Sequence, residues 1–177
     1  MSIMKKLITL VSILFLFTGC SHTYIGNTSF EKLKTASAQD YVEIGVGMGI
    51  SFFTHELAHI AFIKAFNADY DIEFKNYQPY IQYDSTHLSN SEVQWISRAG
   101  LLSQNLVGLF LPKDSYFTIG YNSMSAIQTL TYPVRRDDGD LYELDKAGGS
   151  AGLEWGIYSL LSGYNLFSFL IYFYCIF

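Results

Sequence analysis

The 177-residue sequence is poor in charge and in cysteine. Charged residues make up 15% of it, against about 25% in an ordinary soluble domain. The net charge of -5 argues against a nucleic-acid partner, because binding to phosphates requires an excess of positive charge. Cys20 and Cys175 are the only two cysteines, and no CxxC pair is present, which excludes a disulfide framework and thiolate zinc sites. Half of the residues are hydrophobic and the mean hydropathy is +0.18, so the sequence predicts apolar surroundings for much of the chain.

The N-terminus has the three parts of a bacterial export signal. Lys5 and Lys6 precede an apolar run over 7–17, and Thr-Gly-Cys follows, ending at Cys20. This ending resembles the lipobox of bacterial lipoproteins, so we expect a signal over 1–19 and a lipid on Cys20. An uncleaved signal anchor is the alternative. Both interpretations place the protein in the bacterial cell envelope.

Four long uncharged runs follow the signal, at 44–63, 99–112, 115–134 and 155–177, with Glu56 the single charged residue of the first run. About 20 apolar residues cross a bilayer as a helix. We therefore predict a mainly α protein, a helical membrane bundle of three to four spans. In this interpretation 20–43 is an extracytoplasmic linker and 44–177 is one membrane domain.

Two further features of these runs bear on the membrane arrangement. With Cys20 outside, six basic residues fall on the inner side of the proposed spans and three on the outer side, as the positive-inside rule requires. This favours the inner membrane, with the lipid bilayer as a partner. In the first run, Gly45 and Gly49 form a GxxxG pattern with Gly47 between them, which would permit close approach of another helix. A flexible or non-helical start of this segment is the alternative.

The segment 67–95 has a different pattern from its neighbours. Ile72 and Phe74, and later Ile81 and Tyr83, alternate with polar residues at a period close to 2, and Pro79 marks a break. The pattern predicts a short β-hairpin or edge strand after the first long helix. A structured surface loop is the alternative.

The motif with the clearest chemistry is His-Glu-Leu-Ala-His at 55–59. On a helix His55 and His59 share a face and can bind one metal ion, while Glu56 can act as a general base. Zn²⁺ suits this set because it accepts neutral imidazoles and leaves a position open. Burying two imidazoles and a carboxylate in so apolar a run costs roughly several kcal/mol unless something compensates, and a metal ion would do so. A helix whose histidines only make local hydrogen bonds is the alternative.

Two imidazoles need a third ligand, which is commonly a carboxylate or another histidine. Three candidates lie in the acidic cluster that ends the third uncharged run: Asp137, Asp138 and Asp140. His87, in the polar segment after His59, is a fourth. The residues alone leave the choice open.

With these motifs the sequence resembles the site-2 protease family of intramembrane zinc metalloproteases. Residues 132–139, Tyr-Pro-Val-Arg-Arg-Asp-Asp-Gly, loosely match the family's Asp-Gly motif, and 98–105 match its Ala-Gly segment with a downstream asparagine. The likeness covers roughly 41–150. It implies that Asp138 is the third ligand and that Asn105 contacts the substrate or the oxyanion.

The sequence thus predicts a zinc metallopeptidase that hydrolyses peptide bonds in or next to membrane segments of protein or peptide substrates. His55, His59 and Asp138 would hold Zn²⁺, and Glu56 would be the general base. Two rival hypotheses remain. One is a peripheral lipoprotein facing the periplasm, with a soluble zincin-like fold. The other is a non-enzymatic envelope protein with a structural metal site.

Overall fold

The computed structural model describes residues 33–75, 78–112, 115–132 and 139–171. The predicted export signal over 1–19 and the predicted lipidation site at Cys20 lie outside these residues.

Five helices and one hairpin make up the described chain. In order they are α3 (Ala38–Ala65), β1 (Tyr70–Lys75), β2 (Gln78–Tyr83), α4 (Asn90–Phe110), α5 (Tyr116–Thr131), α6 (Asp140–Lys146) and α7 (Ala151–Ile171). The prediction of a mainly α protein is confirmed. So is the hairpin between the HExxH helix and the next helix. The first helix begins at Ala38, within the linker predicted over 20–43.

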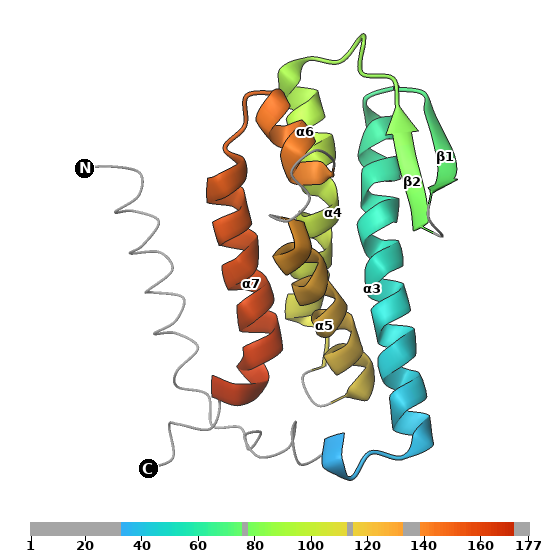
Figure 1. Cartoon of the computed structure of the whole chain (residues 1–177), viewed down its shortest axis with the longest axis vertical. Coiled ribbons are helices and arrows are strands. Elements are labelled where there is room, and N and C mark those ends of the chain that lie inside the picture. Colours follow the sequence, from blue (N-terminus) through green and yellow to red (C-terminus); the bar gives the residue numbers. More distant parts are fainter. Residues whose placement is uncertain (1–32, 76–77, 113–114, 133–138, 172–177) are drawn as a thin grey trace, which may run out of the picture.

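The long helices α3, α4, α5 and α7 run side by side, and α6 lies across one end of the bundle (Figure 1). Serine side chains fix where α3 and α4 begin. Ser37 accepts from the backbone N–H of Asp40, whose carboxylate accepts from Ser37 in return, and Ser89 and Glu92 form the same capping box on α4. These caps place the start of each helix and therefore the direction in which its later side chains point.

The hairpin lies beside the end of α3 that carries the HExxH motif (Figure 1). Its strands are antiparallel, with Tyr70 opposite Tyr83 and Lys75 opposite Gln78. Strand β2 contacts α3 and lies between that helix and β1. Among the described residues β2 pairs only with β1, so its other edge is directed toward the bundle.

Helices α3 and α5 make the closest contact in the bundle, and Gly47 allows it. A Cβ on Gly47 would lie 2.9 Å from the backbone nitrogen of Tyr121, and one on Gly120 would lie 2.8 Å from the Cα of Ile44. Close helix approach in this segment was predicted, but at Gly45 and Gly49. Those two glycines have no described neighbour within 4 Å of a Cβ position, so the prediction named the wrong face.

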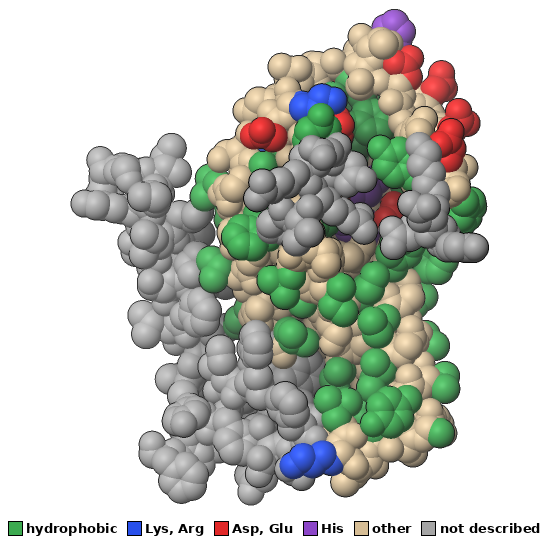
Figure 2. All heavy atoms as spheres, viewed as in Figure 1, with side chains coloured by type: hydrophobic (Ala, Val, Ile, Leu, Met, Phe, Trp, Pro, Cys, Tyr) green, Lys and Arg blue, Asp and Glu red, His purple; other side chains and the backbone are tan. Residues whose placement is uncertain are grey.

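The bundle has an unusual distribution of polarity. Its interior contains many polar side chains, and large apolar side chains are exposed on all four long helices, among them Phe53 on α3, Phe110 on α4, Leu130 on α5 and Leu160 on α7, each more than 60% exposed. Figure 2 shows apolar side chains over the middle of one face and charged ones toward its ends. Among the described helices, α3 alone is long and apolar enough to cross a membrane. Three to four spans are therefore not confirmed.

Candidate metal centre

Helix α3 presents two imidazoles to the interior of the bundle. His55 and His59 are one turn apart, and the two residues are only 2% and 7% exposed. Their Nε2 atoms lie 3.2 Å from each other. The HExxH spacing therefore places both imidazoles at one point, as the sequence predicts.

A carboxylate from a helix later in the sequence completes the group. Asp140 is the first residue of α6, and its Oδ2 atom lies 3.1 Å from Nε2 of His55 and 3.2 Å from Nε2 of His59. The preceding Gly139 has a φ of 94°, a conformation that favours glycine, and this turn directs the start of α6 toward α3. These three residues could hold a metal ion.

The spacing of the three atoms tests whether a metal would fit. Ligand atoms at the usual zinc distances of about 2.0–2.1 Å are separated by about 3.3 Å in a tetrahedral site. The separations of 3.1 and 3.2 Å are close to this value. Two imidazole nitrogens and a carboxylate oxygen directed at one buried point also suit a cation, whether a shared proton or a metal ion, because burial penalises unpaired polar atoms. Donor chemistry and spacing both fit a divalent metal.

A backbone contact orients His59 for this role. Its Nδ1 atom lies 2.8 Å from the carbonyl oxygen of Ile96 in α4. A carbonyl can only accept, so Nδ1 carries a proton, and Nε2 is the nitrogen of His59 that faces the metal position. Nδ1 of His55 is buried and has no hydrogen-bond partner among the described residues. The His59 ring is therefore held more firmly than that of His55.

Gly100 of α4 forms the floor of the site. A Cβ at this position would lie 2.6 Å from Nε2 of His55 and would also collide with Nε2 of His59. The imidazoles therefore pack directly against the backbone of α4. Any larger residue at position 100 would have to displace the two atoms that face the metal position.

The surroundings of Asp140 favour its ionised form. Burial alone would raise the pKa of this carboxyl, but the imidazoles of His59 and His55 outweigh burial and hold the pKa well below its usual range. Asp140 is thus ready to bind a cation. Burial raises the pKa of the nearby Tyr83 phenol to about 12, with the charges of Glu143 and Asp140 adding to the effect. Tyr83 therefore stays protonated.

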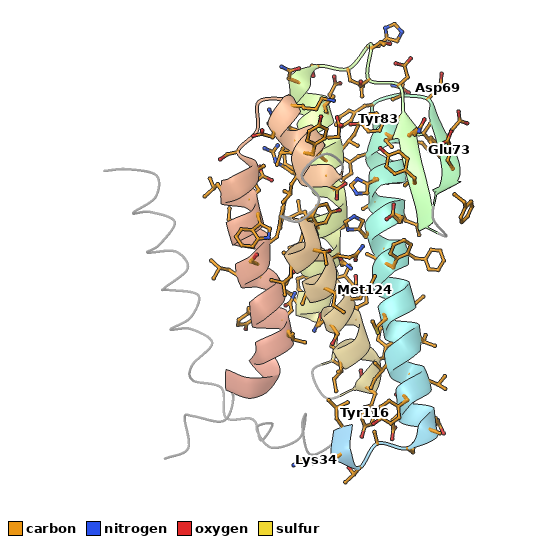
Figure 3. All side chains as sticks on the ribbon, viewed as in Figure 1. Lys34, Asp69, Glu73, Tyr83, Tyr116 and Met124 are labelled. Carbon is orange, nitrogen blue, oxygen red and sulfur yellow. The ribbon has the colours of Figure 1, made fainter. Side chains whose placement is uncertain are left out.

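A cavity of about 960 Å³ opens onto the three ligand candidates. Glu56, the predicted general base, lines it, as do residues 80–83 of β2. Met124 of α5 also lines the cavity, and Figure 3 labels it together with Tyr83 of β2. The cavity therefore offers a substrate access to the metal position alongside a carboxylate and a strand edge.

The structure brings together some of the predicted site residues and separates others. His55, His59 and Glu56 meet at the cavity. Asp138 and Asp137 lie outside the described residues, and Asp140 of the same cluster lies beside the imidazoles. His87 is exposed in the turn before α4, apart from this group.

Asn105, the predicted substrate or oxyanion contact, does not line the cavity. It is fully buried within the bundle, where its side chain donates to the carbonyl oxygen of Leu101 and accepts from Ser162 of α7. These bonds engage both ends of its amide. The structure therefore places Asn105 between α4 and α7, where it bonds the two helices together.

Sequence reasoning did not assign a role to Gly100 or to Tyr132, which also borders the site. The hydroxyl of Tyr132 lies 2.6 Å from Oδ2 of Asp140. Both residues fall within the segments that resemble the site-2 protease motifs. Gly100 matters because its missing side chain leaves room for His55 and His59, which lie some 40 positions earlier in the sequence. That contact leaves no local signal.

Comparison with known proteins adds no relative. No family model, no curated protein and no solved structure matches this chain. The resemblance to the site-2 protease family therefore rests on its motifs alone.

Replacing Gly100 with alanine should weaken metal binding without removing a ligand. The added methyl must displace the imidazoles, and overpacking of this kind costs about 1–3 kcal/mol, or roughly 5- to 150-fold in affinity. Competition of the purified protein with a chromophoric chelator for Zn²⁺ measures the change. Gly49→Ala is the matched control, since this glycine has open space around it. Equal affinities in the two variants would show that the imidazoles do not bind metal where they lie.

The choice among the clustered carboxylates can be tested directly. Asp140→Ala should lower Zn²⁺ affinity by about 100-fold or more, because even changes outside the ligand shell cost about 10–100-fold. Asp145→Ala, an exposed position on the same helix, should have no effect. Asp138→Ala should also have little effect, because Asp140 fills the third position. Loss of metal with Asp138→Ala alone would restore Asp138 as the ligand.

Proposed function

We propose that this protein is a zinc metallopeptidase of the bacterial inner membrane, which hydrolyses peptide bonds in or next to membrane segments of other proteins. The observation that carries the proposal is the meeting of His55, His59 and Asp140 at a cavity that Glu56 also lines. The proposal keeps the predicted imidazoles and base. It takes Asp140, in place of Asp138, as the third ligand.

Each residue of this set has a distinct task. A bound Zn²⁺ would supply Lewis acidity toward the scissile carbonyl and lower the pKa of a water toward about 7. His59, oriented through Ile96, and His55 bind the ion with the ionised Asp140. The Glu56 carboxylate removes a proton from the attacking water and delivers it to the leaving nitrogen of the peptide.

The exposed apolar surface supports a membrane location. In water, a bundle with polar residues inside and large apolar residues outside would lose most of its hydrophobic stabilisation. In lipid the same arrangement is favourable, because apolar side chains meet hydrocarbon and polar side chains bond between helices. The span-like length and hydropathy of α3 agree with this location.

Helix lengths suggest which elements cross the bilayer. At about 1.5 Å per residue, α3, α4 and α7 are each long enough for a hydrocarbon core of about 30 Å. The 16 residues of α5 reach only about 24 Å. Arg98 near the start of α4 bonds Glu154 near the start of α7, so α5 must carry the chain back from the end of α4 to the end where α7 begins. We therefore propose that α3, α4 and α7 span the hydrocarbon fully and that the shorter α5 returns the chain alongside α3.

Strand β2 is the proposed platform for the substrate. A peptide bond in a helix is shielded by its own hydrogen bonds, so a membrane segment must be unwound and held extended before hydrolysis. An open strand edge holds extended chains by backbone pairing. Residues 80–83 of β2 border the same cavity as the metal ligands, which places that edge within reach of the site.

Glu56→Gln should abolish hydrolysis and leave Zn²⁺ content unchanged, since Glu56 is a base and not a ligand. Cleavage of labelled casein and of a labelled single-span peptide in detergent micelles would be compared with zinc content by mass spectrometry. His55→Ala is the control that should lose both. A wild-type protein that holds zinc but cleaves neither probe would instead favour a structural metal site.

Ile81→Pro should impair cleavage and leave zinc content unchanged. Proline removes a backbone donor from β2 without touching a ligand. Ile72 is paired directly opposite Ile81, so Ile72→Pro disturbs the hairpin at the same rung but leaves the backbone of β2 intact. Cleavage that falls equally in both variants would mean that the hairpin acts only as a scaffold.

A Cys20→Ala variant should remain in the inner-membrane fraction after extraction with alkaline carbonate, because the helices hold it there without a lipid anchor. Carbonate releases proteins that are attached only at the surface. Release of the variant into the soluble fraction would instead support the peripheral lipoprotein.

A further inference from the structure

The hydroxyl of Tyr132 lies among the atoms that face the proposed metal position. It is 2.6 Å from Oδ2 of Asp140 and 3.2 Å from Nε2 of His55. The residue is 9% exposed and lines the cavity. No role in metal binding or catalysis follows from the HExxH pattern for this tyrosine.

We propose that the phenol oxygen of Tyr132 is the fourth donor of the metal centre, beside the two imidazoles and the Asp140 carboxylate. The inference extends the proposed function, since it requires the same metal. The four side chains would form a set of two nitrogen and two oxygen donors, drawn from α3, from the end of α5 and from the start of α6.

The choice of oxygen on Asp140 argues for direct binding. A phenol that only oriented this carboxylate would contact Oδ1, the atom left free by the metal. Tyr132 instead donates to Oδ2, the atom that also faces His55 and His59. Its distance of 3.2 Å from Nε2 of His55 is close to the value of about 3.3 Å for neighbouring zinc ligands. The 2.6 Å separation from Oδ2 of Asp140 is that of a hydrogen bond, and it would lengthen when the phenol loses its proton to a metal.

The surroundings of Tyr132 hold its ring in this place. The residue caps the C-terminus of α5, where its N–H donates to the carbonyl oxygen of Gln128. Its ring belongs to a buried cluster with Leu101 and Tyr158. Gly139 lies against the ring, and a Cβ there would be 3.1 Å from Cε1 of Tyr132. The glycine that turns the chain toward Asp140 therefore also leaves room for the tyrosine.

A phenol in the fourth position differs in effect from a third imidazole or a thiolate. A phenol is a weak donor, which a substrate oxygen can displace. Catalytic zinc sites keep a position open to exchange, whereas structural sites are closed by four strong ligands. Tyr132 would occupy that position in the resting protein and yield it, when substrate enters, to the water that Glu56 deprotonates.

Cu²⁺ provides a test that does not depend on activity. When the phenol binds Cu²⁺ it releases its proton to the buffer, and the phenolate gives a charge-transfer absorption in the visible range. We expect this band in the wild-type full chain purified in detergent and its loss in Tyr132→Phe. Zn²⁺ affinity, measured by chelator competition, should fall about 10-fold in the same variant, less than in Asp140→Ala because a phenol is the weaker donor. A phenol that only orients Asp140 could give a similar fall, so the charge-transfer band distinguishes the two roles.

Two controls separate this role from general effects on folding. Tyr158→Phe changes a tyrosine of the same buried cluster, whose hydroxyl bonds to Glu154, and Tyr83→Phe changes a tyrosine that lines the cavity. Both should keep the band. Its persistence in Tyr132→Phe, or its loss in Tyr83→Phe, would overturn the assignment.

The wild-type protein alone is also decisive, which matters if Tyr132→Phe does not fold. Resonance Raman spectra excited in the band should contain the ring modes of a copper-bound phenolate. Wild-type protein that binds Cu²⁺ and Zn²⁺ without these modes would overturn the inference and leave the proposed function standing. Wild-type protein that binds neither ion would overturn both.

Discussion

The contact of two imidazoles with the bare backbone of Gly100 is the constraint on which the site depends. It fixes how close α4 lies to α3 at the level of the HExxH motif. The same approach brings the carbonyl oxygen of Ile96 to Nδ1 of His59. Helix packing therefore sets the position of both imidazoles and the nitrogen that His59 can offer, and the carboxylate of Asp140 contacts a pair that the two helices have already arranged.

Patterns with a local physical cause could be predicted from the sequence. The four-residue spacing of the histidines places them on one helix face wherever the helix packs, and alternation over 70–83 is sufficient for a hairpin. The third ligand could not be chosen in this way. Three carboxylates lie within four positions, and the one that faces α3 depends on how the chain turns at Gly139.

The limits of hydropathy have a physical cause as well. Helices α4 and α5 carry polar residues that face the interior, such as Gln104 and Thr118, and these lower the mean hydropathy although the outward residues are apolar. An average over a run cannot separate two faces of one helix. For the same reason the glycine that contacts α5, Gly47, could not be told from its neighbours Gly45 and Gly49 before the helix orientation was known.

The buried asparagines carry a consequence for assembly. The side chain of Asn165 in α7 donates to the backbone carbonyl oxygen of Asn105 in α4, and the backbone carbonyl oxygen of Asn165 accepts from the side chain of Asn122 in α5. Ser162, also of α7, donates to the Asn105 side chain. These partners are synthesised after α4 and α5, so until α7 packs the amides of α4 and α5 must bond to other groups, such as water. When α7 packs, its bonds to Asn105 and Asn122 replace those contacts and hold α4, α5 and α7 together.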